Sequence, residues 1–158
     1  MSIYNFKLKN TSGEVVDFSS FKGKTILIVN VASKCGFAGQ YKGLEKLHQD
    51  YKNDGIVILG FPCTQFKNQE FETDQETKDF CTLKYDVTFE IFSRIDVKGE
   101  NQAPLYKFLT ESLPWNSKKL DVKWNFEKFL INKEGSIVKR YPSITTPKKI
   151  EKDIVQIL

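Results

Sequence analysis

The most informative stretch of the chain reads Thr25-Ile26-Leu27-Ile28-Val29-Asn30-Val31-Ala32. An apolar run of this length that is rich in β-branched residues is typical of a strand buried on both faces. A helix that stops at Gly55 is predicted beyond it, because apolar residues recur there three and four positions apart: Tyr41, Leu44, Leu47 and Tyr51. A second apolar run covers residues 56–61. Strand, helix and strand in this order predict a βαβ unit with parallel strands.

The segments on either side of this unit extend the α/β pattern. Residues 3–8 and 14–18 predict an N-terminal β-hairpin, and residues 129–132 and 136–141 predict a second one. Further helices are expected from the capping box at Thr73 to about residue 85, over residues 105–113, and from Thr146 onward. We therefore expect an α/β fold with a central mixed β-sheet flanked by helices. No repeat or linker divides the chain, so we expect residues 1–158 to form a single domain.

The composition is that of a folded protein with a surface of mixed charge. The chain has 158 residues, of which 24 are Lys or Arg and 20 are Asp or Glu, and its net charge is +4. Arg94 and Arg140 are the only arginines, and lysines are interleaved with acidic residues, so we expect no nucleic-acid binding. The chain starts without the apolar run of a signal peptide, and no segment has transmembrane length. We therefore expect a cytoplasmic protein without stable membrane association, in which the three cysteines do not form a disulfide framework.

Cys35 lies just beyond the first buried strand and just before a helix. Open α/β sheets place reactive groups at the carboxyl ends of parallel strands, and the N–H groups at the start of a helix favour a thiolate. Lys34 adds positive charge, and the polar neighbours together with Gly36 favour exposure of the thiol. We therefore predict that Cys35 is reactive and not merely packed in the core.

The residues around Cys35 exclude several kinds of cysteine chemistry. Ala38 stands where a Cys-X-X-Cys oxidoreductase has its second cysteine. The only histidine, His48, lies roughly 15–20 Å down the next helix and is too far away to act as the base of a papain-like nucleophile. A zinc site has paired ligands at short spacings, and this pattern is absent from the four candidate ligands Cys35, His48, Cys63 and Cys81. We therefore expect neither a metal nor a cofactor. Reduction of a peroxide bond is the leading reaction, and it needs neutral N–H donors that stabilise the thiolate and then the departing oxyanion.

Three motifs, in the expected order and spacing, resemble those of the glutathione peroxidase family. They are Asn30-Val31-Ala32-Ser33-Lys34-Cys35-Gly36-Phe37, Phe61-Pro62-Cys63-Thr64-Gln65-Phe66-Lys67-Asn68-Gln69-Glu70 and Lys123-Trp124-Asn125-Phe126-Glu127-Lys128-Phe129-Leu130. The similarity extends over essentially the whole chain. It implies a thioredoxin-like fold and a thiol peroxidase that acts on hydrogen peroxide and on organic hydroperoxides, including those of lipids.

The resemblance also implies a catalytic tetrad. Cys35 would be the peroxidatic cysteine, which the peroxide oxidises to a sulfenic acid. Gln69, Trp124 and Asn125 would supply the neutral donors that the chemistry requires.

Composition alone does not decide which residues supply these donors. Gln65 is as good an amide as Gln69, four positions earlier, and Trp115-Asn116 repeats the Trp124-Asn125 dipeptide. The family pattern alone selects Gln69 and Trp124-Asn125.

The resemblance assigns Cys81 as a resolving cysteine. It would attack the Cys35 sulfenic acid and form a Cys35–Cys81 disulfide, which thioredoxin, or less readily glutathione, would reduce. Because a disulfide needs Cα atoms within about 7 Å, we expect the helix that carries Cys81 to unwind locally. Cys63 is interpreted as structural, and the resemblance implies a monomer. An alternative function is a peroxide sensor that passes its disulfide to a signalling partner.

Overall fold

The computed structural model describes residues 1–158 and contains a five-stranded mixed sheet with strand order β5-β4-β3-β6-β7. The five strands are β3 (Thr25–Val31), β4 (Ile56–Pro62), β5 (Glu90–Ile91), β6 (Lys128–Ile131) and β7 (Ile137–Tyr141). β3 pairs in parallel with β4 and antiparallel with β6, and it therefore lies at the centre of the sheet. All seven residues of β3 are buried, as expected for an apolar run in a central strand.

The predicted βαβ unit is confirmed. β3 and β4 are in register from Thr25 opposite Ile56 to Val31 opposite Pro62. The connection between them contains α1 (Gln40–Tyr51) and turns into β4 at Gly55, whose φ of 101° lies in the left-handed region that glycine adopts readily. The carboxyl ends of β3 and β4 consequently meet at the same end of the sheet.

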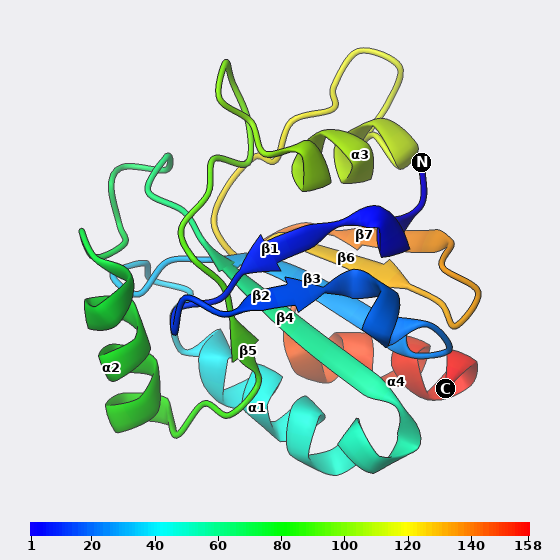
Figure 1. Cartoon of the computed structure of the whole chain (residues 1–158), viewed down its shortest axis with the longest axis horizontal. Helices are drawn as coiled ribbons and strands as arrows, with labels where there is room; N and C mark the ends of the chain where they lie inside the picture. The colour runs from blue at the N-terminus through cyan, green and yellow to red at the C-terminus, as the bar shows by residue number, and fades with distance from the viewer.

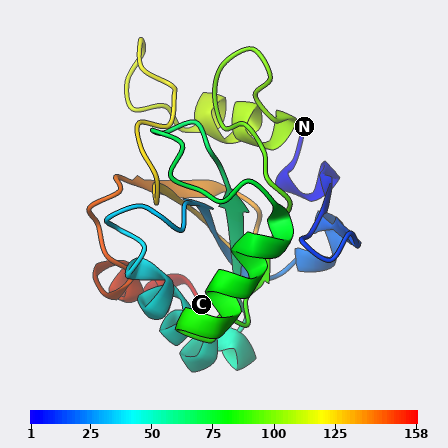
Figure 2. The same cartoon turned by 90° about the vertical axis from the view of Figure 1, so that its left-hand side faces the viewer.

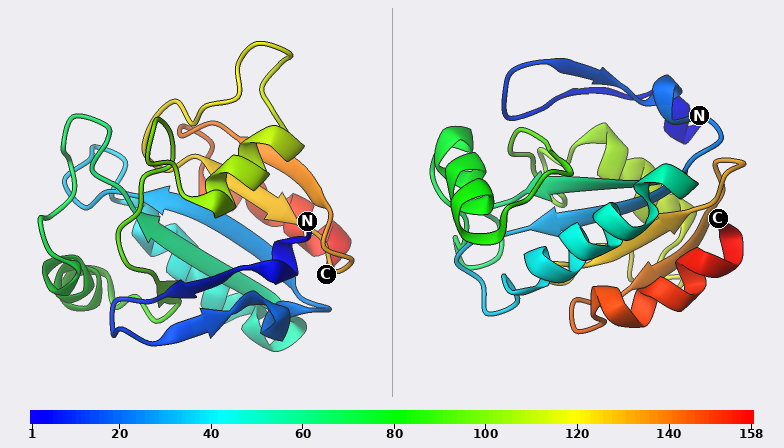
Figure 3. Two further views of the ribbon diagram at one scale, coloured as in Figure 1. Left: turned by 45° about the horizontal axis from the view of Figure 1, so that its top comes forward. Right: turned by 90° about the horizontal axis from the view of Figure 1, so that it is seen from below.

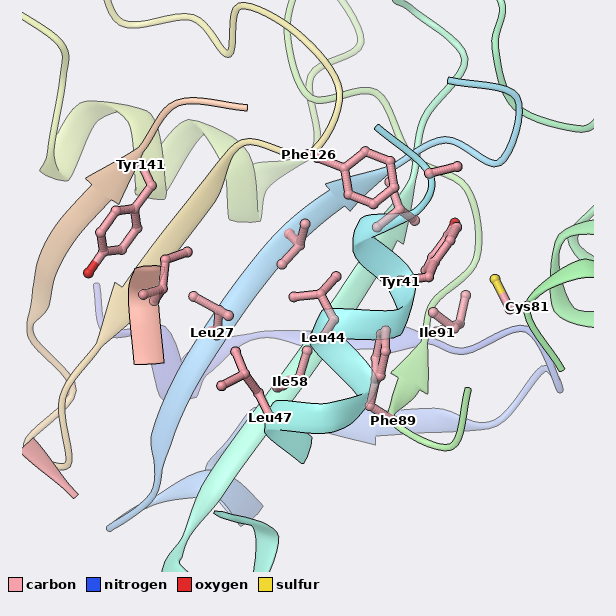
Figure 4. Packing of buried hydrophobic residues seen from close by; sticks show 14 of the residues in the cluster. Leu27, Tyr41, Leu44, Leu47, Ile58, Cys81, Phe89, Ile91, Phe126 and Tyr141 are labelled. Atoms are coloured by element: carbon pink, nitrogen blue, oxygen red, sulfur yellow. The ribbon is translucent and has the colours of Figure 1, made fainter. Parts of the chain in front are cut away.

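The sheet separates two apolar layers, because alternate residues of β3 point to opposite faces. Leu27, Val29 and Val31 belong to the layer beneath α1 and α4 (Pro147–Ile157). Ile26 and Ile28 belong to the opposite layer, to which α3 (Pro104–Ser112) and the N-terminal segment contribute. Figures 1 and 3 show α1 and α4 together on one face, and Figure 4 shows the packing of Leu44 and Leu47 of α1 in the first layer.

The N-terminal hairpin is also confirmed, but its strands are shorter than predicted. β1 (Lys7–Lys9) and β2 (Val15–Asp17) form a separate antiparallel two-stranded sheet. Short 3-10 helices at Ile3–Asn5 and Phe18–Phe21 take up residues that we expected in strands. Side-chain caps explain both changes, because the Ser2 hydroxyl accepts the Tyr4 N–H and the Asp17 carboxylate accepts the Ser19 N–H.

α2 (Asp74–Tyr85) lies at one end of the sheet and packs against α1 through Phe80 and Tyr85, whose rings contact Tyr41. As its sequence predicted, it begins after Thr73, whose hydroxyl accepts the Glu76 N–H at 3.2 Å. Of its twelve residues only Thr77 and Cys81 are buried. It ends at Asp86, a non-glycine residue with a φ of 52°.

β5 was not predicted, and it contributes only two residue pairs to β4. No helix of the protein is long and apolar enough to cross a membrane.

Candidate active site around Cys35

Three segments lie together at one end of the sheet, which Figure 2 shows facing the viewer. They are residues 32–39 after β3, residues 63–73 after β4 and residues 113–127 before β6. In open α/β folds this end of the strands is where ligands and reactive groups lie. Each of the three segments carries one of the motifs identified in the sequence.

Cys35 lies in the first segment, and its sulfur accepts the N–H of Phe37 at 3.4 Å. The side chain is 7 % exposed, so the expectation of an exposed thiol was wrong. It belongs to the apolar layer beneath α1 and α4, against which Phe37 and Trp124 also pack. Because α1 begins only at Gln40, the N–H donor to the sulfur comes from the turn that precedes the helix.

Gln69 is joined to both of the other segments. Its backbone carbonyl accepts the N–H of Lys34, next to Cys35, at 2.7 Å. Its side-chain oxygen accepts a hydrogen bond from the amide Nδ2 of Asn125 at 3.1 Å. Lys67 and Asn68 make this approach possible, since both have left-handed φ angles, of 55° and 50°. The remaining NH2 group of Gln69 is left as a donor.

The Trp124-Asn125 turn is held by Asn30, the one polar side chain within the apolar part of β3. Asn30 Nδ2 donates to the Trp124 carbonyl at 3.0 Å, and Asn30 Oδ1 accepts the Glu127 N–H at 3.1 Å. The Asn30 carbonyl accepts the N–H of Phe126, whose φ is 63°. Sequence reasoning did not assign a role to Asn30, although a fully buried amide in an apolar strand requires partners and was therefore a usable signal.

The structure separates the paired candidates that composition could not. Both ends of the Gln65 amide bond to the loop at residues 97–98: Oε1 accepts the Val97 N–H at 2.7 Å, and Nε2 donates to the Lys98 carbonyl at 2.8 Å. Trp115 stacks against the Arg140 guanidinium at 4.4 Å. The Gln65 amide is therefore engaged elsewhere, and the Trp115 ring packs on Arg140 with its indole N–H unpartnered, whereas Gln69 and Asn125 bond to each other.

All three cysteines are free and buried. Burial raises the pKa of the Cys81 thiol to about 12, and burial likewise raises the pKa of Cys63. The Cys63 sulfur accepts the N–H of Gln65 at 3.5 Å, which is a turn contact within the second segment. No group of three or more His, Cys, Asp or Glu side chains is arranged to hold a metal ion.

The site thus combines a thiol with several uncharged N–H donors. In the structure no hydrogen bond joins the side chains of Gln69, Trp124 or Asn125 to the Cys35 sulfur, whose one donor is Phe37. Asn125 is fully buried, and its Oδ1 has no hydrogen-bond partner. Neutral donors of this kind can stabilise negative charge on sulfur or oxygen without being titrated themselves.

Comparison with known sequences identifies the same family that the three motifs resemble. A family model described as glutathione peroxidase matches residues 3–110. The glutathione peroxidase-like peroxiredoxin gpx1 of Schizosaccharomyces pombe is 48% identical, with 98% of each chain covered. The hydroperoxy fatty acid reductase gpx1 of Synechocystis is 44% identical, over 99% of this chain and 96% of the relative.

Solved structures show the same similarity at the level of the fold. The crystal structure of T. cruzi GPX1 covers 99% of this chain and 96% of its own at a TM-score of 0.81, with 33% identity. A thiol:disulfide interchange protein of the thioredoxin family from Chlorobium tepidum has a TM-score of 0.73 at only 10% identity, over 96% of this chain and 92% of its own. The second similarity concerns the fold alone, and it confirms the expected thioredoxin-like architecture.

Proposed function

This chain belongs to the glutathione peroxidase family and is a peroxide-reducing thiol enzyme, and from that premise we propose that Cys35 is the residue that attacks the peroxide. The observation that carries the proposal is the position of this thiol. It lies at the carboxyl end of β3, with the Phe37 N–H directed at its sulfur and the Gln69–Asn125 amide pair on the adjoining segments.

The first step consumes one hydroperoxide. The Cys35 thiolate attacks the terminal oxygen of ROOH, the O–O bond breaks, and the RO⁻ group takes up a proton and leaves as an alcohol, or as water when the substrate is hydrogen peroxide. The sulfur is oxidised to a sulfenic acid. Negative charge moves from the sulfur to the departing oxygen during this step, so donors on both atoms lower the barrier.

We assign these donors to Gln69, Trp124 and Asn125. The Asn125 Nδ2 bond to Gln69 Oε1 orients the Gln69 amide, so that its NH2 end is available to the peroxide. Trp124 packs against the layer that contains Cys35 and adds an indole N–H, a donor that does not accept protons. Removal of one such donor typically lowers kcat by about 10²–10³-fold.

Cys81 is the residue that we propose resolves the sulfenic acid. Its position in α2 supports this role, because α2 has only two buried residues and ends at a strained left-handed Asp86. A helix that buries only two of its side chains fully, and otherwise packs through the half-buried rings of Phe80 and Tyr85, can open locally while the sheet stays folded. Opening would release Cys81 to approach Cys35 and form the disulfide.

The disulfide product favours a dithiol protein such as thioredoxin as the reductant over glutathione, because exchange with a dithiol completes the reduction within one encounter. On the substrate side, a hollow of about 480 Å³ lies next to Gly36 and Phe37, which follow Cys35 in the sequence. It is lined by Gly36, Phe37, Gly43, Ile144 and Pro147 among others, and Ile144 is 71 % exposed. We propose that it accommodates the carbon chain of an organic or fatty-acyl hydroperoxide.

A coupled assay tests the proposal. NADPH consumption is followed with thioredoxin and thioredoxin reductase, using hydrogen peroxide and a fatty-acid hydroperoxide, for the wild type, Cys35→Ser, Cys81→Ser and the matched control Cys63→Ala. We expect no turnover in Cys35→Ser, loss of thioredoxin-linked turnover in Cys81→Ser after one round of oxidation, and activity within about threefold of wild type in Cys63→Ala. Undiminished turnover in Cys81→Ser contradicts the resolving role. Slow wild-type turnover together with a trapped mixed disulfide to another protein favours a peroxide sensor.

A further inference from the structure

Glu70 is a buried carboxyl group that the steps above do not use. It is 1 % exposed, and no salt bridge reaches it. Its Oε1 accepts the N–H of Phe71 at 2.9 Å, whereas its Oε2 is buried and has no hydrogen-bond partner. A buried carboxylate without a counter-ion is unfavourable, so its presence here calls for a functional explanation.

The side chains around Glu70 come from three elements and include Cys81. Thr77 and Cys81, the two buried residues of α2, lie one helical turn apart on the same face of the helix, and Phe80, next to Cys81, packs against Phe71, which follows Glu70. Ser33 and Tyr41 complete the cluster, with their hydroxyl oxygens 3.4 Å apart. Figure 4 shows the Cys81 sulfur directed from α2 toward Tyr41. Exposure is at most 5 % for the five members of the cluster: Ser33, Tyr41, Glu70, Thr77 and Cys81.

The charges in this cluster oppose ionisation of Cys81. Burial is the largest cause of its pKa of about 12, and the negative charge of Glu70 raises the pKa further. Hydrogen bonding by Tyr41 and Ser33 acts in the opposite direction. Burial also raises the pKa of Glu70, which makes this carboxylate a better proton acceptor.

Few other charged groups face Cys81. Tyr41 approaches from α1, and burial raises its pKa well above the ordinary value, so it stays protonated. On the solvent side, Cys81 lines a hollow together with Lys78, Glu14 and Glu90. Glu70 is thus the one buried acceptor in the cluster.

We propose that Glu70 accepts the Cys81 proton while α2 is still folded, directly or through the Ser33 hydroxyl, so that Cys81 is already a thiolate when α2 opens and it attacks the Cys35 sulfenic acid. This inference rests on the proposed resolving role of Cys81. The Cys81–Cys35 S–S bond forms, the S–O bond of the sulfenic acid breaks, and the departing hydroxide takes up the proton that Glu70 has received. One water is released, both sulfurs end in the disulfide, and the Glu70 carboxylate is restored.

The inference predicts a specific defect in Glu70→Gln, with Glu70→Asp as the variant that keeps a carboxylate. After rapid mixing with one equivalent of hydrogen peroxide, the first step is followed by peroxide loss. The second step is followed by acid quench, thiol alkylation and mass spectrometry of Cys81. In Glu70→Gln we expect disulfide formation at pH 7 to slow by about 10²-fold, the lower range of general-base catalysis, while peroxide loss changes much less. Glu70→Asp should recover part of the rate.

The pH profile separates proton transfer from packing. In the wild type the disulfide step should level off above the Glu70 titration, measured independently on the wild-type protein by ¹³C NMR of the carboxyl. In Glu70→Gln the rate should rise about tenfold per pH unit up to about pH 9, because it follows the small thiolate fraction.

Two results overturn the inference: equal disulfide rates and profiles in wild type and Glu70→Gln, or a wild-type inflection that does not coincide with the Glu70 titration. Slowing of both steps by the same factor also overturns it, since Glu70 would then shape only the Gln69 segment. If the wild type forms no Cys35–Cys81 disulfide, the resolving role itself fails before any variant is compared.

Discussion

The side-chain amide of Asn125 donates to the side-chain oxygen of Gln69 at 3.1 Å, although 56 positions separate the two residues in the sequence. This bond joins the segment after β4 to the segment before β6, beside the Cys35 loop. It also determines which end of each amide is left for a substrate. Gln69 keeps its NH2 donors, and Asn125 Oδ1 keeps no partner.

We predict that Asn125→Ala slows the oxidation of Cys35 by roughly 10²-fold, because the substitution removes one donor and releases the orientation of Gln69. The measurement is the second-order rate of peroxide consumption under single-turnover conditions. Asn116→Ala is the matched control, since Asn116 follows the other tryptophan and its Oδ1 only accepts the N–H groups of Lys118 and Lys119. Equal rates for the two variants would exclude Asn125 from the chemical step.

Truncation of Gln65 should mainly lower stability, whereas truncation of Gln69 should mainly lower the rate of Cys35 oxidation. Gln65→Ala leaves the Val97 N–H and the Lys98 carbonyl without their partners, and we expect unfolding free energy to fall by about 1–3 kcal/mol with little change in the rate of Cys35 oxidation. Gln69→Ala should lower that rate, and its stability should change less because Gln69 is only half-buried. Urea unfolding and single-turnover kinetics on both variants test this pair. A catalytic defect confined to Gln65→Ala would reverse the assignment.

Arg140 and Glu127 form a buried ion pair at 2.8 Å, with both side chains at most 2 % exposed. Arg140 also donates to the Leu113 carbonyl and stacks on Trp115. We expect Arg140→Met to destabilise the protein by about 3–5 kcal/mol, because Glu127 then stays buried without a counter-ion. Arg140→Lys should recover little of this, since an ammonium group lacks the planar, forked geometry.

Lys139→Met is the control for this prediction. The neighbouring Lys139 pairs with Asp153 at 3.2 Å on the surface, where its side chain is 53 % exposed. Loss of this pair should lower stability by less than about 1 kcal/mol in the same urea titration. If Lys139→Met and Arg140→Met lower the unfolding free energy by similar amounts, burial does not determine how much each ion pair contributes to stability.

Lys128 is fully buried, and its ammonium donates to the carbonyls of Ser143 and Thr145 at 3.0 and 2.6 Å. Burial lowers its pKa from 10.5 to about 7, so above pH 7 the unfolded chain binds more protons than the folded one. Stability should therefore rise as pH increases from about 7 to 8.5, by at most ~1.4 kcal/mol per unit. Above that range the buried thiols of Cys63 and Cys81, whose pKa values are raised, act in the opposite direction.

The measurement is the unfolding free energy of wild type and Lys128→Met across this pH range. Subtraction of the two curves cancels the thiol contributions, and the difference should slope upward with pH. A flat difference would mean that Lys128 stays charged when it is buried.

The long, strongly patterned elements were predictable from the sequence, and the short ones were not. The apolar run at 25–32 and the stripe at Tyr41, Leu44 and Leu47 determine β3 and α1 locally, and Thr73 marks the start of α2 by its own side chain. β5 has two residues and exists because β4 offers free backbone groups beside it, so no local pattern announces it. The hairpin strands were overestimated because side-chain caps compete with strand formation at Ser2 and Asp17.

Within the candidate site, residue types were predictable and contacts were not. Cys35 could be singled out from its place after a buried strand, but its burial could not, because the apolar layer that contains it is assembled from α1, β4 and the segment before β6. The family pattern selected Gln69 over Gln65, but no local pattern contains the bond between Gln69 and Asn125 that supports this proposal. Glu70 ends the second motif but received no role from the sequence, because a glutamate in a loop is usually solvated, whereas the structure buries it to 1 % exposure.

Asn30 has a consequence for the time over which the site keeps its shape. The backbone amides of Phe126 and Glu127 both donate to Asn30, which is fully buried in the central strand. We expect these two amide protons to exchange with deuterated solvent as slowly as those of the sheet, and the amides of α2 to exchange faster through local opening. In the proposed cycle, the Trp124-Asn125 turn would then keep its shape while the sheet stays folded, and the helix that carries Cys81 would open and close within that lifetime.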